Sequence, residues 1–534
     1  MNFSRLLFTA SFFLSFAASN AQSLMRMEIE AASASDQYNI LPVGKNGVIL
    51  FNENQEKGEK GEKVIEFTKY DVNFKKVWTK QQAVSSRMTM VKYDYDMDNL
   101  YLLLMGTRRN ADYSVLRLNI NSGSITATNG KTPVRMRVTD FKAMGDDAFW
   151  GGSTVPSWFQ MCLYGYTCGL ARSAVNTTPL LMHTDLAAQN SELAKLKYKG
   201  QCSVTDISKD TEQKTFDAVI ASHPDKKTFD LDVKEFYANG GPKSELRLDP
   251  QGANLPLNAH VSNLKNKEKL IVGTYSQAST SGKQVVVSPY SDGLYITKAK
   301  GEEQEFIKYY AFSELKSFWK YIEANYSARK AMKMKKRARK KSEQGQTLDV
   351  NYQLLVHDVL EYNDQYIMVA EAYYPEYHTE FYTEYVNGKP VTRTRQVFDG
   401  WRYTHAIVCG FDKSGNMLWD NTFEIWNILT FNLKERVRVL PQEKELVLAY
   451  AYGGAIHSKI IQGSEVIDNK SSTPIETNKE GDKVRSNYDS DMAFWYDNYF
   501  VTWGYQRIKN TEEKGKGGKK KRTVFFFNKI QYSN

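Results

Sequence analysis

The sequence has few cysteines, no long apolar run after its first twenty residues and no compact motif for metal binding. Its 534 residues include only four cysteines, so disulfide bonds cannot be the main source of stability. No later apolar run reaches the roughly 20 residues that span a bilayer, which excludes a polytopic membrane protein. A charged fraction of 25% and a hydrophobic fraction of 41% exclude disorder throughout and a collagen-like fold.

Catalytic motifs are also scarce. The seven histidines are scattered without an HExxH pattern or close ligand spacing, and no Walker A sequence is present. Asp94, Asp96 and Asp98 resemble the start of a calcium loop. However, Asn99 stands where the loop needs glycine and Met105 where it needs a bidentate glutamate, which favours an Asp-rich turn. We therefore predict neither a metal nor a cofactor.

The first 21 residues have the pattern of a secretory signal peptide. Arg5 precedes an apolar run over residues 6–18, and Ser19 and Ala21 are the small residues that a signal peptidase requires. We expect cleavage after Ala21, because the run is too short for a membrane anchor. The Asn- and Lys-rich composition is similar to that of proteins exported by Gram-negative bacteria. The expected location is the periplasm, the outer-membrane periphery or the cell exterior.

The cysteines suggest at most one disulfide bond, which would close a loop. Cys162 and Cys168 are close enough in sequence to form a disulfide across a loop, and Cys202 competes for either partner. Free buried thiols are the alternative. Cys409 ends an apolar run and is interpreted as a small core residue.

Short apolar or alternating runs separated by polar turns recur from residue 37 to residue 532, which is a β-strand pattern. Strand-turn-strand units begin near residues 38, 89, 138, 203, 260, 353, 435 and 490. Repeats of roughly 50 to 90 residues predict an all-β fold, a single seven- or eight-bladed β-propeller over residues 22–534. A pair of β-sandwiches and two smaller propellers are the rival architectures. We expect the chain to close by pairing residues 523–532 with residues around 25–30, which hides both sheet edges.

Two segments share a second pattern. Residues 70–78 and 411–419 both begin with an aromatic residue and Asp, pass through a polar turn and end with an aliphatic residue and Trp; residues 118–125 are a looser copy. We interpret this unit as a hairpin in which Asp or Asn bonds the turn backbone and Trp covers the neighbouring sheet.

The unit resembles the outer hairpin of propellers with the pyrroloquinoline-quinone-type repeat, and the resemblance implies the propeller fold. Quinone-dependent dehydrogenases of that group carry vicinal cysteines at the cofactor, and this chain has none. The resemblance is therefore closer to members that act as protein-binding scaffolds.

One segment breaks the β pattern. Residues 312–341 contain neither Gly nor Pro, which predicts one inserted amphipathic and basic helix over residues 312–342, started by Ser313 and Glu314. Its first half has apolar residues at helical spacing and should pack on the propeller. These positions are Leu315, Phe318, Trp319 and Ile322.

The second half of this segment is strongly cationic and does not have the pattern of a packing surface. Nine of the thirteen residues from 329 to 341 are Lys or Arg, a density that an anionic partner would stabilise. Two interpretations stay open: a solvated helix end, or a docking element for an acidic protein, an anionic lipid headgroup or lipopolysaccharide. Nucleic acid is not expected as a partner, because the signal peptide predicts a location outside the cytoplasm. The nine candidates are Arg329, Lys330, Lys333, Lys335, Lys336, Arg337, Arg339, Lys340 and Lys341.

A second cationic cluster over residues 514–522 is interpreted as a solvated loop tip, and the remainder of the chain is mildly acidic. A long hairpin is predicted over residues 373–405, with Asn387 and Gly388 as its turn. Its aromatic residues either pack on a sheet or form an exposed face for protein or glycan contact. The candidates for partner contact are Tyr377, Phe381, Tyr382 and Tyr385.

The leading functional prediction is a non-catalytic exported propeller that binds or scaffolds a protein partner in a bacterial envelope or surface complex. The alternative is a carbohydrate-active enzyme, a glycoside hydrolase or lyase, whose carboxylates come from different blades and meet in the funnel.

Overall fold

The structure is a computed structural model that describes residues 21–532 except for several gaps. The gaps are residues 32–37, 58–61, 107–110, 156–176, 199, 224–228, 278, 282–283, 287–290, 345–347, 349–352, 387–388, 427, 432 and 511–520. Most of the predicted signal peptide and both members of the predicted Cys162–Cys168 disulfide lie outside the described residues. Cys409 is fully buried in the core, as predicted.

The described residues form eight antiparallel sheets of four to six strands, beside one small hairpin. Sheet 1 contains β2 (Tyr38–Pro42), β3 (Val48–Lys57), β4 (Lys63–Tyr70) and β5 (Lys76–Val84). The short turn η1 (Gly44–Asn46) connects β2 to β3. Sheet 2 contains β6 (Met88–Tyr95), β7 (Asn99–Gly106), β8 (Asp112–Asn119) and β9 (Ile125–Lys131). Sheet 3 contains β10 (Met136–Met144), β11 (Asp147–Thr154), β12 (Pro179–Asp185) and β13 (Asn190–Leu193). Sheet 4 contains β14 (Gln201–Asp210), β15 (Thr215–His223), β16 (Asp230–Tyr237) and β17 (Pro242–Arg247).

The remaining sheets carry the insertions and the paired chain ends. Sheet 5 contains β18 (Asn254–Pro256), β19 (His260–Asn263), β20 (Glu268–Gln277), β23 (Gly293–Lys300) and β24 (Glu303–Ala311), with the turn η3 (Lys265–Lys267) and the separate hairpin β21 (Ser279–Ser281) and β22 (Gln284–Val286). Sheet 6 contains β25 (Gln353–Val356), β26 (Leu360–Tyr362), β27 (Gln365–Val386), β28 (Lys389–Phe411), β29 (Met417–Glu424) and β30 (Leu429–Thr430). Sheet 7 contains β31 (Arg438–Pro441), β32 (Leu446–Tyr452), β33 (Ala455–Gln462) and β34 (Glu465–Pro474). Sheet 8 contains β35 (Asp482–Tyr496), β36 (Tyr499–Asn510), β37 (Lys521–Tyr532) and β1 (Ala21–Glu30).

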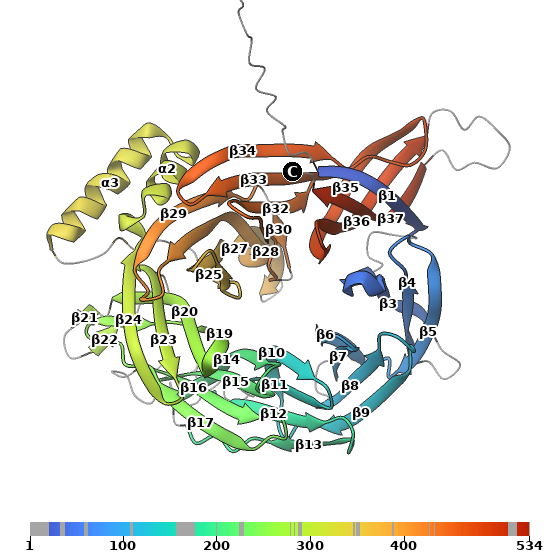
Figure 1. Ribbon diagram of the computed structural model, residues 1–534, viewed down its shortest axis with the longest axis horizontal. Coiled ribbons are helices and arrows are strands. Elements are labelled where there is room, and N and C mark those ends of the chain that lie inside the picture. Colours follow the sequence, from blue (N-terminus) through green and yellow to red (C-terminus); the bar gives the residue numbers. More distant parts are fainter. Residues whose placement is uncertain are drawn as a thin grey trace, which may run out of the picture. The chain divides into compact units, whose positions relative to one another are not determined.

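This series of sheets confirms the predicted all-β propeller fold, and each predicted repeat coincides with one sheet. The chain divides into two compact units, a larger one of residues 36–450 and 458–470 and a smaller one of residues 1–35, 451–457 and 471–534. Within the larger unit the sheets follow one another in sequence order (Figure 1). The boundary between the units passes through strands β32, β33 and β34 of sheet 7.

The core of the larger unit lies in layers between successive sheets. Ile49 and Phe67 of sheet 1 pack with Leu102 of sheet 2, and comparable clusters join the sheets that follow, up to sheet 6. A middle strand is therefore covered on both faces. This explains why residues 100–104 of β7 are all buried apolar residues, whereas β5 at the sheet edge buries only Val84.

The chain termini pair within sheet 8 as predicted. Strand β1 lies antiparallel to β37, with Met25 opposite Lys529 and Glu30 opposite Val524. The first strand of the chain therefore completes the sheet formed by the last three and leaves β37 paired on both sides.

The outer hairpins have the predicted turn chemistry. Asp71 Oδ1 accepts hydrogen bonds from the backbone N–H groups of Asn73 and Lys75 at 2.8 and 2.9 Å. Asp412 Oδ1 does the same for Ser414 and Asn416 at 2.9 and 2.8 Å. The Asp side chain thus replaces backbone partners in a tight turn.

The inserted segment forms two helices, whereas the sequence predicted one. After the turn η4 (Phe312–Glu314), α2 (Lys316–Asn325) ends at Tyr326, whose extended backbone (φ −122°, ψ 153°) precedes α3 (Ala328–Glu343). The change of direction lets each helix bury its own stripe, Phe318 and Ile322 in α2 and Ala331 and Ala338 in α3. None of the helices in the described ranges is long and apolar enough to cross a membrane.

Candidate docking site

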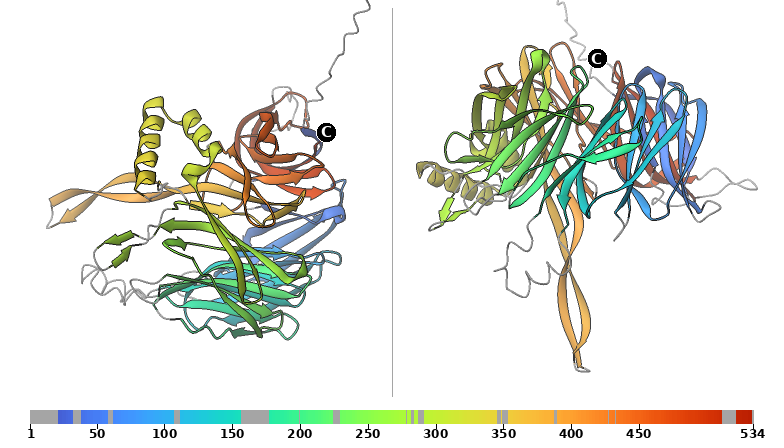
Figure 2. Two further views of the ribbon diagram at one scale, coloured as in Figure 1. Left: turned by 60° about the vertical axis from the view of Figure 1, so that its left-hand side comes forward. Right: turned by 90° about the horizontal axis from the view of Figure 1, so that it is seen from below.

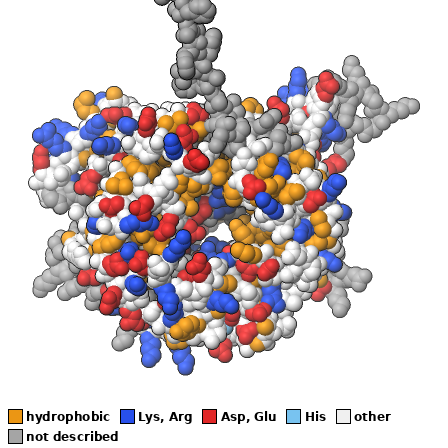
Figure 3. Space-filling model, viewed as in Figure 1, with side chains coloured by type: hydrophobic (Ala, Val, Ile, Leu, Met, Phe, Trp, Pro, Cys, Tyr) orange, Lys and Arg blue, Asp and Glu red, His pale blue; other side chains and the backbone are white. Residues whose placement is uncertain are grey.

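The predicted cations lie on the outer surface of α3. Eight of the nine are exposed and Lys341 is half-buried. Figure 3 shows Lys and Arg gathered over α2 and α3 at its upper left. Lys335 pairs with Glu323, and Arg339 Nε lies 3.2 Å from Glu343 Oε1.

Five of these cations have neither a carboxylate partner nor a ring contact among the described residues. They are Arg329, Lys333, Lys336, Arg337 and Lys340, whereas Lys330 Nζ lies 4.0 Å from the Tyr326 ring centroid. The prediction that this half does not pack needs correction. Ala331 and Ala338 are buried, and the half-buried Met334 lies between them in sequence, because residues three and seven positions apart share one helix face. The small side chains hold α3 against the protein, and its charges point outward.

Strands β27 and β28 extend beyond the rest of sheet 6 as a two-stranded arm of residues 374–400. The neighbouring strands pair with β27 and β28 near their sheet ends: β25 reaches Tyr373, β29 reaches His405 and β30 pairs with Trp401 and Arg402. Figure 2 shows the arm as a long projecting hairpin. The predicted hairpin is confirmed, and its turn at residues 387–388 lies outside the described residues.

The two faces of the arm differ in chemistry. The alternation of side chains along paired strands places residues without charge on one face. That face contains Tyr377, Thr379, Phe381, Thr383, Tyr385, Pro390, Thr392, Thr394, Gln396 and Phe398. The other face has ion pairs: Arg395 Nη2 lies 2.6 Å from Glu380 Oε2, and Arg393 pairs with Glu384.

Aromatic rings continue from the core onto the uncharged face. Tyr373 is buried and contacts Trp401, with ring centroids 5.5 Å apart; Trp401 contacts Phe398 at 5.2 Å, and Phe398 contacts Tyr377 at 5.5 Å. Packing on a sheet, one of the two interpretations of these aromatics, therefore holds at the base of the arm.

Farther out the aromatic side chains are exposed, and their contact with a partner stays a prediction. Tyr377 is 54% exposed, Phe381 74% and Tyr385 73%. Tyr382 is 43% exposed and lies on the charged face, where Arg395 stands 5.9 Å from its ring centroid. Three of the four aromatic candidates therefore share one exposed, uncharged face.

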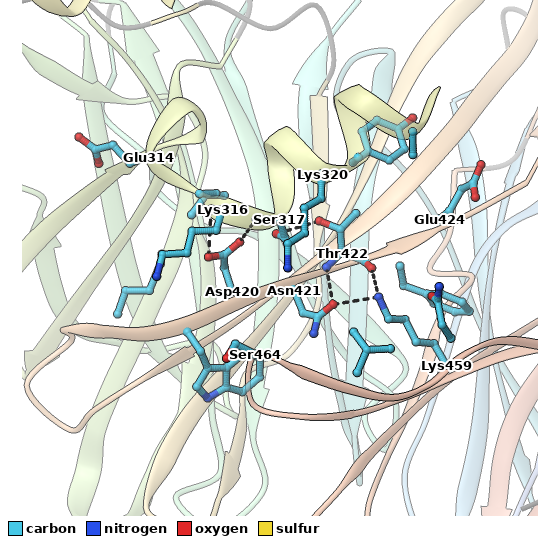
Figure 4. Close-up of a pocket in the computed structure, with 18 of the residues that line it drawn as sticks. Glu314, Lys316, Ser317, Lys320, Asp420, Asn421, Thr422, Glu424, Lys459 and Ser464 are labelled. Atoms are coloured by element: carbon cyan, nitrogen blue, oxygen red, sulfur yellow. Dashed lines mark hydrogen bonds between the residues drawn. The ribbon is translucent and has the colours of Figure 1, made fainter. Parts of the chain in front are cut away.

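A cavity of about 840 Å3 lies beside α2, β29 and residues 459–470 (Figure 4). Lys459 Nζ donates hydrogen bonds to Asn421 Oδ1 at 2.9 Å and to the Thr422 carbonyl at 2.6 Å. Burial, with a smaller effect from the charge of Lys320, lowers the pKa of Lys459 to about 8. The sequence does not indicate that Lys459 is buried, because a lysine is ordinary in an alternating strand such as Ala455–Gln462. Its role beside this cavity was therefore not predicted.

The start of α2 is fixed by a residue distant in sequence. The carboxylate of Asp420 accepts hydrogen bonds from the backbone N–H groups of Lys316 at 3.2 Å and Ser317 at 2.7 Å (Figure 4). Ser313 and Glu314, predicted to start the helix, instead form η4, where Glu314 Oε2 accepts from the Ala311 N–H group at 3.2 Å.

Replacing Asp420 by alanine should release the first turn of α2. We expect a loss of about 1–2 kcal/mol in the free energy of unfolding, because a carboxylate that satisfies helix N–H groups is worth that much. Hydrogen exchange should accelerate at residues 316–319. The matched control is Asp412→Ala, which removes a turn bond elsewhere in sheet 6 and should leave α2 protected; equal exchange in both variants would contradict the capping role.

Acidic side chains on the first strands of successive sheets join those sheets. Asp94 Oδ2 accepts from the Ala143 N–H group at 2.8 Å, and Asp140 Oδ2 accepts from the Ile207 N–H group at 3.0 Å. Both Asp140 and Asp206 follow Val-Thr at a β-bulge. The repeated Val-Thr-Asp at residues 138–140 and 204–206 is the sequence signal that could have identified this feature.

His260 lies between Asp206 of sheet 4 and Asp358, which lies between β25 and β26. Its Nδ1 lies 3.1 Å from Asp206 Oδ2 and its Nε2 lies 2.7 Å from Asp358 Oδ1. Burial lowers the pKa of His260, but the two carboxylates outweigh it and hold the pKa well above its ordinary value. His260 on β19 of sheet 5 therefore contacts a carboxylate from sheet 4 and a second one beside sheet 6. Within the described ranges, no three His, Cys, Asp or Glu side chains are grouped to hold a metal.

The comparisons with known proteins describe the fold only. The sequence matches no protein-family model and no characterised protein. The structure is similar to polysaccharide lyase Uly1 (8% identity, TM-score 0.39, covering 96% of this chain and 100% of that one). It is also similar to the β-propeller domain of the Trilobed protease from Pyrococcus furiosus (8%, 0.31, 84% and 99%) and to a prolyl endopeptidase (8%, 0.38, 90% and 55%). These neighbours have β-propeller folds, and the resemblance to the pyrroloquinoline-quinone-type repeat stays a prediction.

Proposed function

We propose that this chain is an exported, non-catalytic binding propeller of a bacterial envelope or surface complex, and that the arm and α3 dock a protein partner. The observation that carries the proposal is the uncharged face of the arm, with three large rings exposed at its outer part. Soluble proteins rarely leave such a patch without a partner, and Tyr is enriched among the residues that dominate binding energy.

The length of the arm supports the same proposal. A two-stranded hairpin standing alone is only marginally stable in water, and cross-strand pairs contribute little each. Here ion pairs between Arg395 and Glu380, and between Arg393 and Glu384, occupy the charged face. Among the described residues of the arm, the opposite face has no such pairs, which leaves its rings and hydroxyl groups for contact with the partner.

Helix α3 adds a charge preference. Its five cations that have neither a carboxylate nor a ring partner among the described residues favour a partner with an acidic rim around the surface that receives the rings. Rim charges mainly raise the association rate and make it dependent on salt. The rings, which become buried when the partner binds, would instead set the dissociation rate.

Photo-crosslinking in the cell tests this proposal. A crosslinking residue at Phe381 should capture a specific protein, which is then purified and measured against the mature chain. The triple variant Tyr377→Ser, Phe381→Ser and Tyr385→Ser should weaken binding about 100-fold, through faster dissociation and without a change in melting temperature. The variant with Arg329, Lys333, Lys336, Arg337 and Lys340 replaced by Gln should associate more slowly at low salt and normally at high salt.

The control removes an ion pair from the other face of the arm with Glu380→Gln and Arg395→Gln, which should change the affinity less than about threefold. A second control places the crosslinker at the exposed Met97 of sheet 2. The proposal is wrong if Phe381 and Met97 capture the same proteins, or if the triple variant binds normally. Capture of a polysaccharide in place of a protein would also overturn it.

A further inference from the structure

Sheet 8 carries a concentration of positive charge that the docking site does not use. A cavity of about 460 Å3 lies against strands β35, β36 and β37 of the smaller unit. Five cations line it together with Ile508 and Thr523. They are Arg485, Arg507, Lys509, Lys521 and Arg522.

The strand register places like charges directly opposite each other. Lys509 lies between Lys483 on β35 and Lys521 on β37, and Arg507 lies two residues before Lys509 on the same face. Directly opposed like charges destabilise a sheet. None of these cations, nor Arg485, has a carboxylate partner among the described residues. The repulsion between these cations therefore lowers the stability of the folded sheet.

The neighbouring arginine shows the contrast. Arg522, adjacent to Lys521 in sequence, bonds to the carboxylate of Asp482, and its Nη2 lies 3.2 Å from Glu28 Oε2. Arg522 also lines the cavity, but Asp482 and Glu28 neutralise its charge, whereas the other four cations of the lining have no carboxylate partner among the described residues. Unopposed cations next to a cavity are better explained by a ligand than by folding.

We propose that this cavity binds a phosphate-bearing group through Arg485, Arg507, Lys509 and Lys521. Phosphate suits the site because it carries nearly two negative charges and several acceptor oxygens, whereas a single carboxylate carries one charge. Two guanidinium groups supply paired N–H donors and two ammonium groups supply compact charge, the combination that recognises phosphate oxygens. The phosphate can belong to a soluble compound or to a lipid headgroup.

The test uses the mature protein and two probes, inorganic pyrophosphate and vesicles of phosphatidylglycerol diluted into phosphatidylcholine. Pyrophosphate should raise the melting temperature of the wild type, since a ligand that binds the folded state stabilises it. The variant Arg507→Gln with Lys509→Gln should bind pyrophosphate at least tenfold more weakly. Without ligand it should be as stable as the wild type or more stable, because the repulsion across the strands is relieved.

The charge-matched control is Lys80→Gln with Arg87→Gln, which removes two exposed charges on and beside β5 and should change pyrophosphate binding less than twofold. If the sheet variant loses both pyrophosphate and vesicle binding, the phosphate belongs to a lipid headgroup; if vesicles never bind, it belongs to a soluble compound. The proposal is overturned if pyrophosphate neither binds nor stabilises the wild type, or if both variants lose binding equally. Because these residues lie outside the arm and α3, the result is independent of the proposed docking site.

Discussion

Replacing Lys269 by methionine is expected to lower the free energy of unfolding by about 3–5 kcal/mol. Lys269 on β20 is buried, pairs with Asp217 on β15 and lies 3.1 Å from Glu235 on β16. It therefore joins sheets 4 and 5 through two buried carboxylates. Removing the cation alone leaves those carboxylates close together, which costs far more than the loss of one surface ion pair.

The pH dependence of this loss is a sharper test than its size. Burial raises the pKa of Asp217 to about 6, and the charge of Lys269 opposes that rise. A carboxyl group whose pKa is raised on folding favours the folded state in acid, and this contribution is lost as the pH rises through the folded-state pKa. In Lys269→Met the opposing charge is gone, so the pKa of Asp217 should rise further. The loss of stability should then be larger at pH 8 than at pH 5.

Urea unfolding at the two pH values measures both effects. The control is Lys243→Met, which removes a partly exposed cation 2.9 Å from Glu235 and should cost about 1 kcal/mol or less. A second variant, Lys269→Met with Asp217→Asn, should recover part of the stability and lose most of the pH dependence. Equal losses for the Lys269 and Lys243 variants, or a loss independent of pH, would contradict the buried ion cluster.

Replacing Glu371 by leucine is expected to cost about 3–5 kcal/mol in the free energy of unfolding. Glu371 is fully buried, and its Oε1 accepts from the Arg436 and Val437 N–H groups at 2.7 and 2.8 Å and from His357 Nε2 at 2.8 Å. Leucine would leave buried donors without an acceptor, and each such donor costs about 1–3 kcal/mol. The carboxylate joins β27, which also forms the arm, to the chain that enters sheet 7.

His357 reports on the same contact. Burial lowers the pKa of His357, but Glu435 and Glu371 outweigh it and raise the pKa above its ordinary value. This raised pKa contributes stability below pH about 6.5 that is lost as the pH rises through the folded-state pKa. In Glu371→Leu the pKa of His357, measured by NMR titration, should fall, and the destabilisation should be larger at pH 5.5 than in alkaline solution.

The matched control is Glu435→Leu, which removes a partly exposed carboxylate 4.0 Å from His357 that accepts neither of these backbone bonds. It should lower the pKa of His357 while costing about 1 kcal/mol or less. A Glu371 variant as stable as the Glu435 variant would show that the backbone contacts of Glu371 contribute little.

The repeats in the sequence determined the fold class. Apolar runs and polar turns are local signals, and each predicted repeat became one sheet. The pairing of residues 523–532 with residues 25–30 was predictable because an unpaired strand at either end would expose a sheet edge. The turns at Asp71 and Asp412 were predictable because an Asx side chain bonds the backbone two to four residues ahead.

The tertiary structure decided which side chains are available. The nine cations of α3 and the aromatics of the arm were identified from sequence, but their exposure depends on where neighbouring strands stop pairing. The break at Tyr326 was not predictable, because no Gly or Pro marks it. The start of α2 was not predictable either, because the carboxylate that accepts from its first N–H groups belongs to Asp420, about a hundred residues later in the chain. The opposed lysines of sheet 8 are also invisible in the sequence, because cross-strand register alone brings Lys483, Lys509 and Lys521 together. Local composition therefore sets strands and turns, whereas long-range register and packing determine which charges and rings meet solvent.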